Sequence, residues 1–269
     1  MIKNITIGQY VPGESFVHKL DPRIKIILSL VFIVNLFIID NFSGYILVIL
    51  LLAIILATGK LSPKFIYKGL KPVLVLLIIT AILNIFTVKR GNLLFELGFL
   101  KVYDEGLKQA AFMALRLIFL IAGTSILTLT TSPIELTDGI EKLLKPFEKI
   151  GVPAHMIAMM MTIALRFIPT LIDETDKIMK AQMARGADFD SGNIIAKAKS
   201  LIPLLVPLFI SSFRRADELA MAMEARCYKG GDGRTRMKVL KLNYNDLIAV
   251  LFFILLIIAT ILVNKTNLP

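Results

Sequence analysis

The sequence contains one cysteine, Cys227, and two histidines, His18 and His155, among its 269 residues. A single cysteine excludes an intrachain disulfide, so no oxidised framework holds this chain together. The two histidines are far apart in sequence and lack the close spacing of metal ligands, so we predict no metal site. The sequence also has no Ser-His-Asp or zinc-protease pattern. We therefore expect a chain that is not itself catalytic and does not hydrolyse ATP.

The first twenty residues contain no apolar run of the kind found in a secretory signal peptide. We expect the first apolar segment further along the chain to direct membrane insertion. Acidic residues are also fewer than basic ones, which leaves a net charge of +11. The basic residues flank apolar blocks instead of forming one patch, which argues against nucleic acid and favours cytoplasmic membrane loops.

Apolar residues make up 56% of the chain, and the mean hydropathy is +0.75. Because the charges fall between long apolar blocks, this composition is typical of a polytopic membrane protein. A helix needs about 20 apolar residues to cross the hydrocarbon core. The predicted fold is therefore all-α, with five transmembrane helices at about 24–40, 43–59, 72–88, 107–131 and 246–263.

The distribution of Lys and Arg predicts the orientation of these spans. Four basic residues precede the first span, and four more lie between the second and the third. We therefore expect a multi-pass protein of the bacterial cell membrane with a cytoplasmic N-terminus and an external C-terminus. The predicted domains are a four-span membrane domain at 1–131, a cytoplasmic coupling domain at 132–245 and a last span at 246–269.

The segment 132–245 is too charged for continuous membrane and too apolar for a solvated linker. Its periodicity predicts an amphipathic helix at 134–150, then a long helix from about 154 to 185. After a polar break at 187–200 we expect a third helix at 202–227, with Pro207 bending it or delaying its start. The last two helices share an apolar start, a charged and Met-rich middle and a terminal arginine.

These two helices end in Ala184-Arg185-Gly186 and Ala225-Arg226-Cys227. A cation in the last helical turn complements the helix dipole by about 0.3–1 kcal/mol, and Gly follows as a left-handed cap. Either end alone is an ordinary helix terminus. Two such ends on two long amphipathic helices of one membrane protein are harder to attribute to capping alone.

Three stretches resemble the transmembrane T component (EcfT/CbiQ-like) of energy-coupling factor (ECF) transporters, the vitamin and metal-ion branch of ABC importers. They are GQYVPGESFVHKLDPRIKI at 8–26, ALRFIPTLIDETDKIMKAQMARGADF at 164–189 and ADELAMAMEARCYKG at 216–230. The resemblance spans nearly the whole chain in order, and the paired arginine motifs are its specific part. It implies a coupling scaffold without bound cofactor, which links two cytoplasmic ATPase subunits to a substrate-binding membrane S component.

In that family the two motifs end crossed helices and dock on the ATPases, which use ATP and Mg²⁺. The resemblance thus assigns ATPase docking to Ala184, Arg185, Gly186, Ala225, Arg226 and Cys227. The second motif usually ends in Gly. Because Cys is penalised in the left-handed region, we expect the cap to move to Gly230 or the turn to stay right-handed.

Two other features allow more than one interpretation. Methionines recur in both helices, either as core filling or as an adaptable interface for several substrate subunits. The candidates for that interface are Met159, Met160, Met221 and Met223. Arg116, about ten residues into the fourth span, is either functional or structural, by snorkelling or by pairing with helix-end carbonyls.

The main alternative function is a self-contained permease or channel, which needs a polar pathway through the spans. A membrane enzyme would need paired carboxylates or histidine ligands at membrane depth, and the predicted spans show none. The sequence identifies neither the transported substrate nor whether the ATPases are identical. It also leaves open whether the module is shared among several substrate subunits.

Overall fold

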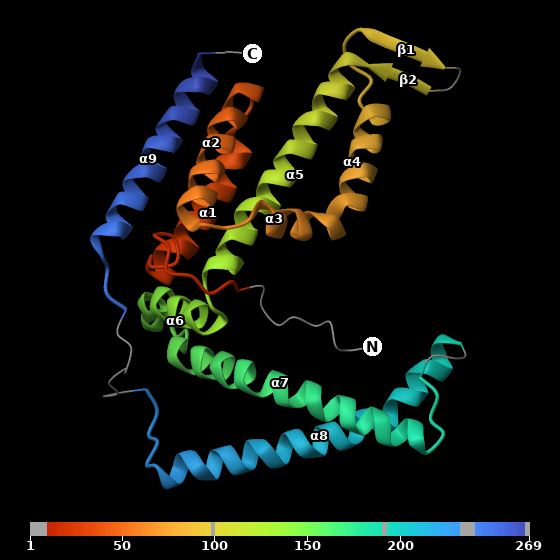
Figure 1. Ribbon diagram of the computed structural model, residues 1–269, viewed down its shortest axis with the longest axis vertical. Coiled ribbons are helices and arrows are strands. Elements are labelled where there is room, and N and C mark those ends of the chain that lie inside the picture. The colour runs from red at the N-terminus through yellow and green to blue at the C-terminus, as the bar shows by residue number, and fades with distance from the viewer. Residues whose placement is uncertain (1–9, 98–99, 190–192, 232–239, 267–269) are drawn as a thin grey trace. The chain divides into compact units, whose positions relative to one another are not determined.

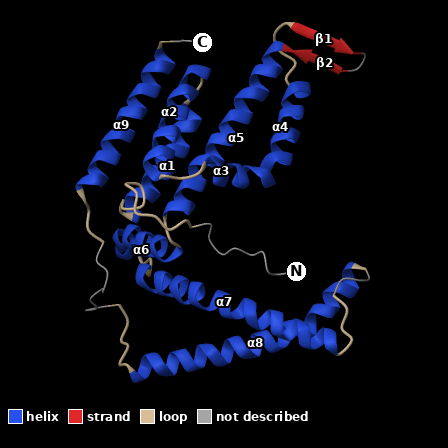
Figure 2. Ribbon diagram, viewed as in Figure 1, coloured by secondary structure: helices blue, strands red, loops and turns tan. Residues whose placement is uncertain are grey.

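The computed structural model describes residues 10–97, 100–189, 193–231 and 240–266, and in this part the chain is almost entirely helical (Figures 1 and 2). The predicted helical fold class is confirmed. The sequence analysis did not predict one short antiparallel hairpin, formed by β1 (Leu93–Leu97) and β2 (Leu100–Tyr103) between two of the spans. The first two residues of the family-like stretch at 8–26 lie outside the described residues.

Internal contacts divide the chain into two units. One contains residues 8–139 and 239–269, and we call it the span unit. The other contains residues 140–238 together with 1–7, and we call it the crossed-helix unit. Each is described separately below.

The span unit holds a helix at each of the five predicted membrane segments. Helices α1, α2, α4, α5 and α9 comprise Pro22–Ile38, Phe42–Gly59, Leu74–Thr87, Asp104–Thr130 and Tyr244–Lys265. A short amphipathic helix, α3 (Pro63–Leu70), and the 3₁₀ turn η1 (Lys71–Val73) lead into α4.

Five helical segments of the described residues are long and apolar enough to cross a membrane, as predicted, but one of the five differs. Helix α1 has only 17 residues, and the long helix α7 (Ala154–Ala184) qualifies in its place. Length and composition alone do not distinguish a spanning helix from one that lies along the membrane surface. The charges in the second half of α7 set it apart from the other four.

The ends of α1 and α9 are fixed by local capping. Asp21 accepts a hydrogen bond from the backbone N–H of Arg23. Pro22 occupies the first helical turn, where a backbone N–H would have no helical acceptor, so its missing N–H costs no hydrogen bond. Helix α9 begins with a reciprocal capping box between Asn243 and Asp246. Asp246 also accepts a hydrogen bond from the backbone N–H of Asp21, so the beginnings of α1 and α9 are joined.

Helix α5 lies at the centre of the span unit and packs against α1, α2, α3 and α4. The largest buried cluster lies where α1, α2 and α5 meet; it includes Phe32, Leu36, Tyr45, Leu51, Phe119 and Ile126. Helix α9, more than 200 residues later in sequence, packs on α1 and α2. The α1–α2 link, the β1–β2 hairpin and the C-terminal end of α9 lie at one end of this unit, and α3 lies at the other (Figure 1).

In the crossed-helix unit, α7 and α8 (Ile194–Ala225) pack against each other and run in opposite directions (Figure 1). The predicted amphipathic helix at 134–150 is present as α6 (Pro133–Leu144), of which the residues after Gly139 belong to this unit, followed by the 3₁₀ turn η2 (Lys145–Ile150). The long helix predicted at 154–185 corresponds to α7.

The start of α8 was predicted wrongly. The helix begins at Ile194, inside the stretch expected to be a polar break, and continues through Pro203 and Pro207. Proline removes one helical hydrogen bond and bends a helix without having to end it, because neighbouring turns keep their own bonds. The first turns of α8 lie at an angle to the rest (Figure 1).

Candidate functional site

The first predicted docking end closes α7 with a complete Schellman motif. Gly186 has a left-handed φ of +89°, and its N–H donates to Met183 O at 3.0 Å. The N–H of Ala187 donates to Gln182 O, also at 3.0 Å. These two bonds satisfy carbonyls that the helix end would otherwise leave without partners. The chain therefore turns sharply away immediately after Arg185.

The second docking end has the same hydrogen-bond pattern, although it lacks the glycine. Cys227 has a left-handed φ of +57°, and its N–H donates to Glu224 O at 2.8 Å. The N–H of Tyr228 donates to Met223 O at 3.0 Å. Position by position, this motif matches the one that ends α7.

Both alternatives expected for the second end are therefore wrong. The left-handed cap has not moved to Gly230, and the turn after Arg226 is not right-handed. Cys227 itself adopts the strained conformation, because the two hydrogen bonds of the motif hold it there. Consequently Arg185 and Arg226 occupy equivalent positions at the ends of their helices.

All six residues predicted for ATPase docking are exposed: Ala184, Arg185, Gly186, Ala225, Arg226 and Cys227. Within the described residues, neither arginine forms an ion pair. Each guanidinium therefore keeps its fork of donors available for a carboxylate or backbone carbonyl of another molecule. Because the helices run antiparallel, their arginine ends point in opposite directions (Figure 1). The structure thus separates the two ends instead of bringing them together.

An ion pair links the two helices where they cross. Arg215 on α8 donates from Nη2 to Oε2 of Glu174 on α7, at 2.6 Å. Both side chains are partly shielded, with 34% and 23% of their surface exposed. Beside the pair, apolar side chains of the two helices, among them Phe167 and Leu219, line a groove of about 340 Å³. The sequence analysis did not identify this contact, because it joins residues 41 positions apart.

The predicted methionine interface is placed on two different surfaces. Met160 and Met221 are well exposed, at 59% and 61%. Met159 is half-buried, and Met223 lines the groove between α7 and α8. Met223 therefore fills space between the two helices, whereas Met160 and Met221 face outward.

A larger exposed apolar surface lies on the part of α8 that the sequence analysis described only as an apolar start. It consists of Leu205, Val206, Phe209, Ile210 and Phe213, each between 45% and 69% exposed. Exposed apolar side chains in such a contiguous run typically mark an interface with another protein or with lipid. The available signal was the helical spacing of these residues, which becomes clear once α8 is known to run through Pro203 and Pro207.

In the span unit, Arg116 pairs with a helix-end carbonyl, as one of its two predicted roles required. Its Nη2 donates to Ile39 O at the end of α1, at 3.0 Å. The guanidinium also lies over the rings of Phe37 and Phe112, with its central carbon 5.3 Å and 4.9 Å from their centroids. Nε of Arg116 is buried and has no hydrogen-bond partner among the described residues. Arg116 therefore supports the end of α1 and still has unused donors.

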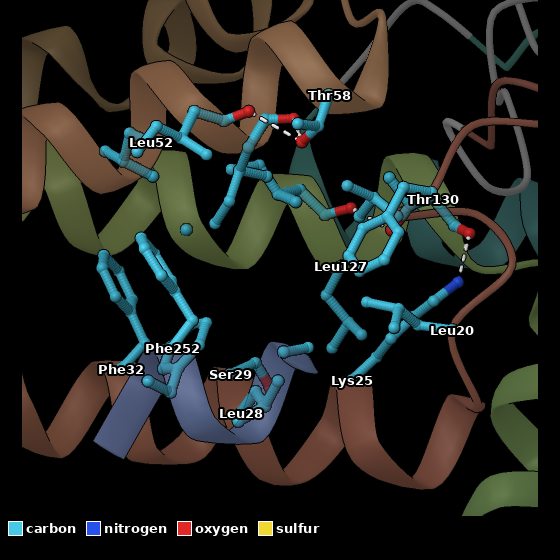
Figure 3. Close-up of a pocket in the computed structure, with 18 of the residues that line it drawn as sticks. Leu20, Lys25, Leu28, Ser29, Phe32, Leu52, Thr58, Leu127, Thr130 and Phe252 are labelled. Carbon is cyan, nitrogen blue, oxygen red and sulfur yellow. Dashed lines mark hydrogen bonds between the residues drawn. The ribbon is translucent and has the colours of Figure 1, made fainter. Parts of the chain in front are cut away.

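A mostly apolar cavity of about 350 Å³ lies between α1, α2, α5 and the start of α9 (Figure 3). Phe32 and Phe252 line one part of it, and Lys25 lies at another (Figure 3). Nζ of Lys25 donates to Thr130 O at 2.9 Å and to His18 O at 3.0 Å. The ammonium thus caps the C-terminal end of α5 and holds the segment before α1, which contains His18, against that end.

The sequence is similar to those of known transport proteins. The family described as CbiQ, cobalt transport protein, matches residues 13–238. A protein of Clostridium kluyveri named energy-coupling factor transporter transmembrane protein EcfT is 69% identical over 263 residues, which cover 97% of each chain. A protein of the same name from Thermosediminibacter oceani is 58% identical, over 97% of this chain and 98% of its own length. The one from Bacillus subtilis is 48% identical, over 95% of this chain and 97% of its own length.

Proposed function

The chain belongs to the CbiQ family, as the transmembrane protein of an energy-coupling factor transporter, and on that premise we propose that its two arginine-ended helices dock two cytoplasmic ATPase subunits. It is a multi-pass membrane protein and a non-catalytic subunit of a transporter complex. The resemblance to this family that the sequence analysis identified is confirmed.

One observation supports the docking proposal above the others. Two helix ends that differ in sequence at Gly186 and Cys227 adopt the same capping motif and expose an arginine at the same position. An ordinary cap does not require this equivalence, because a helix can end in many ways. Two matching sites that point in opposite directions suit two similar partners, one at each end. An arginine on a rigid helix end also transmits a displacement that a loop would absorb.

The substrate-binding membrane subunit would pack on the exposed apolar side chains of the same helices. The surface on α8 from Leu205 to Phe213, with Met160 and Met221, offers aromatic and flexible thioether groups. Such groups adapt to partners of different shape, which suits a scaffold that serves several substrate subunits. ATP and Mg²⁺ would bind the ATPases only. ATP binding and hydrolysis there would shift α7 and α8 and thereby move the substrate subunit, for uptake of a vitamin or a metal ion.

Capture of the ATPases provides the direct test. The full chain would be co-expressed with candidate ATPases from its own genome, and pull-down of wild type would be compared with Arg185→Glu/Arg226→Glu. We expect the double variant to insert in the membrane and to lose capture, because it replaces each docking arginine with a carboxylate of opposite charge. Each single variant should retain one docking point and bind about 30-fold or more weakly, as for a buried paired arginine.

The matched control is Lys177→Glu/Arg214→Glu, which makes the same charge change at exposed positions within the same two helices. It should leave capture intact. Undiminished capture by the Arg185→Glu/Arg226→Glu variant would show that both arginines are ordinary helix caps and would refute the docking role. Transport by the purified chain alone would instead support a self-contained permease or channel.

We further propose that the N-terminus and the crossed-helix unit are cytoplasmic and that the C-terminus is external, in a bacterial cell membrane. The clusters of Lys and Arg before α1 and between α2 and α4 support this orientation. Cys227, the only cysteine, is exposed and gives a native reporter. A membrane-impermeant maleimide should label it only after permeabilisation. In a Cys227→Ser/Lys265→Cys variant the same reagent should label intact cells, and labelling of wild type in intact cells would reverse the assignment.

A further inference from the structure

A basic hollow lies in the span unit where the ends of α1 and α4 meet the beginnings of α2 and α5. Its volume is about 880 Å³, and four cations line it: Lys89, Arg90, Lys108 and Arg116. Only two carboxylates, Asp40 and Glu105, line the same hollow, which leaves an excess of two positive charges. Clefts lined by one sign of charge attract ligands of the opposite sign.

An intramolecular ion pair neutralises only one of these four cations. Lys108 pairs with Asp104 at 3.0 Å. Among the described residues, no carboxylate forms an ion pair with Arg116, Lys89 or Arg90. Arg116 is the most constrained of the three, because one hydrogen bond to Ile39 O and two aromatic rings hold it, while its Nε has no acceptor in the part of the chain that the structure describes. A guanidinium so placed favours an anion with several acceptor oxygens.

The position of the hollow at the end of a short helix indicates the source of that anion. Helix α1 has 17 residues and is therefore only about 25 Å long, whereas the hydrocarbon core is about 30 Å thick. A bilayer meets a short hydrophobic helix by thinning around it, which lowers the headgroups there. Arg116 bonds the end of this short helix, and it lies twelve residues, or about 18 Å, along α5 from its first residue. Thinning of the bilayer around α1 would bring phospholipid phosphates closer to Arg116.

We propose that this basic hollow binds the phosphate of an anionic phospholipid headgroup. Arg116 provides the deep contact, and Arg90 and Lys89 approach the same group from the segment that follows α4. The bound lipid supplies the counter-charge that the chain itself does not give Arg116. It also holds the end of α1 against α5, because Arg116 contacts both the lipid and Ile39.

The test uses the purified full chain in detergent and titrates it with phosphatidylglycerol or phosphatidylcholine, with the thermal unfolding midpoint and native mass spectrometry as readouts. Wild type should bind phosphatidylglycerol about tenfold or more tightly than phosphatidylcholine, because both lipids carry the phosphate but the choline of the second adds a cation that the surplus positive charge of the hollow repels. Arg116→Gln should abolish this preference. Since that variant also loses the contact to Ile39, Lys89→Gln/Arg90→Gln serves as a second variant that changes only exposed residues, and it should weaken the preference several-fold.

The matched control is Lys64→Gln/Lys68→Gln, which removes two exposed charges from α3, outside the hollow. It should keep the full preference for phosphatidylglycerol. An unchanged preference in Lys89→Gln/Arg90→Gln, or an equal loss in the control, would overturn the proposal. Stabilisation by millimolar glycerol phosphate to the same extent as by phosphatidylglycerol would overturn the lipid source, because it would identify a site for a soluble phosphate.

Discussion

Glu174 and Arg215 form an ion pair between α7 and α8, and each lies eleven residues before the arginine that ends its own helix. At 1.5 Å per residue, about 16 Å of helix separates the pair from Arg185 on one side and from Arg226 on the other. The two helices are thus fastened to each other at equal distances from the two predicted docking ends. A displacement at either docking end therefore reaches the crossing point through the same length of helix.

We predict that Arg215→Ala will reduce coupling more than it reduces ATPase docking. The substitution removes the only ion pair that the described residues place between α7 and α8, so these helices can slide against each other. The loss of a partly shielded pair costs about 1–2 kcal/mol. We expect normal pull-down of the ATPases, a lower unfolding midpoint, and less substrate taken up per ATP hydrolysed by the reconstituted complex.

The charge-swapped variant Glu174→Arg/Arg215→Glu is the matched control. It restores an ion pair at the crossing and should recover most of the unfolding midpoint that either single substitution loses. If the double variant is as unstable as the sum of the two singles, the ion pair is not what holds the crossing together.

Cys227→Gly should stabilise the end of α8. Cys227 has a φ of +57°, a region that a side chain with a Cβ disfavours by about 1–2 kcal/mol, whereas Gly adopts it freely. Glycine loses part of this gain through its larger entropy in the unfolded chain, which leaves about 0.5–1 kcal/mol. Hydrogen exchange at the amides of residues 227 and 228 should slow about two- to fivefold, because these two N–H groups form the capping bonds.

Gly186→Ala makes the opposite change at the equivalent position of α7. Gly186 has a φ of +89° and open space around it, so strain in the backbone and not a steric contact decides the outcome. Exchange at residues 186 and 187 should speed up. A change in the same direction for both variants would contradict the equivalence of the two helix ends.

The docking ends illustrate what the sequence alone could predict. Arginine followed by glycine is a local pattern, and local backbone geometry follows from it, so the end of α7 was predictable. Cys227 was not, because its left-handed conformation depends on whether two hydrogen bonds outweigh the strain. A similar balance explains the start of α8. The pattern predicted a helix from 202, with Pro207 bending it or delaying its start, whereas α8 begins at Ile194 and continues through both prolines.

Contacts between distant residues were beyond the sequence analysis for a different reason. The spans were predicted because their signal lies in the length and composition of each segment. The pairing of Arg215 with Glu174, or of Thr260 with Asn35, depends on which helix faces lie together. A single sequence does not specify that arrangement, so these contacts emerged only from the structure.

Asn35 and Thr260 join the first and last spans in the buried interior of the span unit. Oγ1 of Thr260 lies 2.8 Å from the side-chain oxygen of Asn35 and 2.7 Å from Ile257 O. One hydroxyl proton cannot serve both acceptors, and Nδ2 of Asn35 has no partner among the described residues. Both groups are satisfied when the Asn35 amide turns so that Nδ2 donates to Thr260 and Thr260 donates to Ile257 O.

Thr260→Val should therefore destabilise the chain by about 0.6–2 kcal/mol, because it leaves a buried Asn35 amide without any partner. The thermal unfolding midpoint in detergent measures the effect. Adding Asn35→Leu to the same chain removes the orphaned amide and should recover much of the loss. If Asn35→Leu/Thr260→Val is less stable than Thr260→Val alone, the polar contact contributes little and packing at these positions dominates.

Gly123→Ala should destabilise the chain by up to about 2 kcal/mol, although alanine is the better helix former by about 1 kcal/mol. A Cβ at residue 123 would overlap the ring of Phe32, lying only 2.6 Å from its Cδ1. Phe32 is buried at 3% exposure, so its ring can move only into the cavity that it lines together with Gly123 (Figure 3). Such overpacking costs about 1–3 kcal/mol, which exceeds the gain in helix propensity. We expect a lower unfolding midpoint for Gly123→Ala and a partial recovery in Gly123→Ala/Phe32→Leu, because the smaller side chain gives the new methyl group room.

The control is Leu120→Ala, elsewhere on α5, which removes packing instead of adding too much. Adding Phe32→Leu to that variant should lower the midpoint further. If Phe32→Leu fails to rescue Gly123→Ala, then close approach of α1 and α5 at Gly123 is not limited by the ring of Phe32.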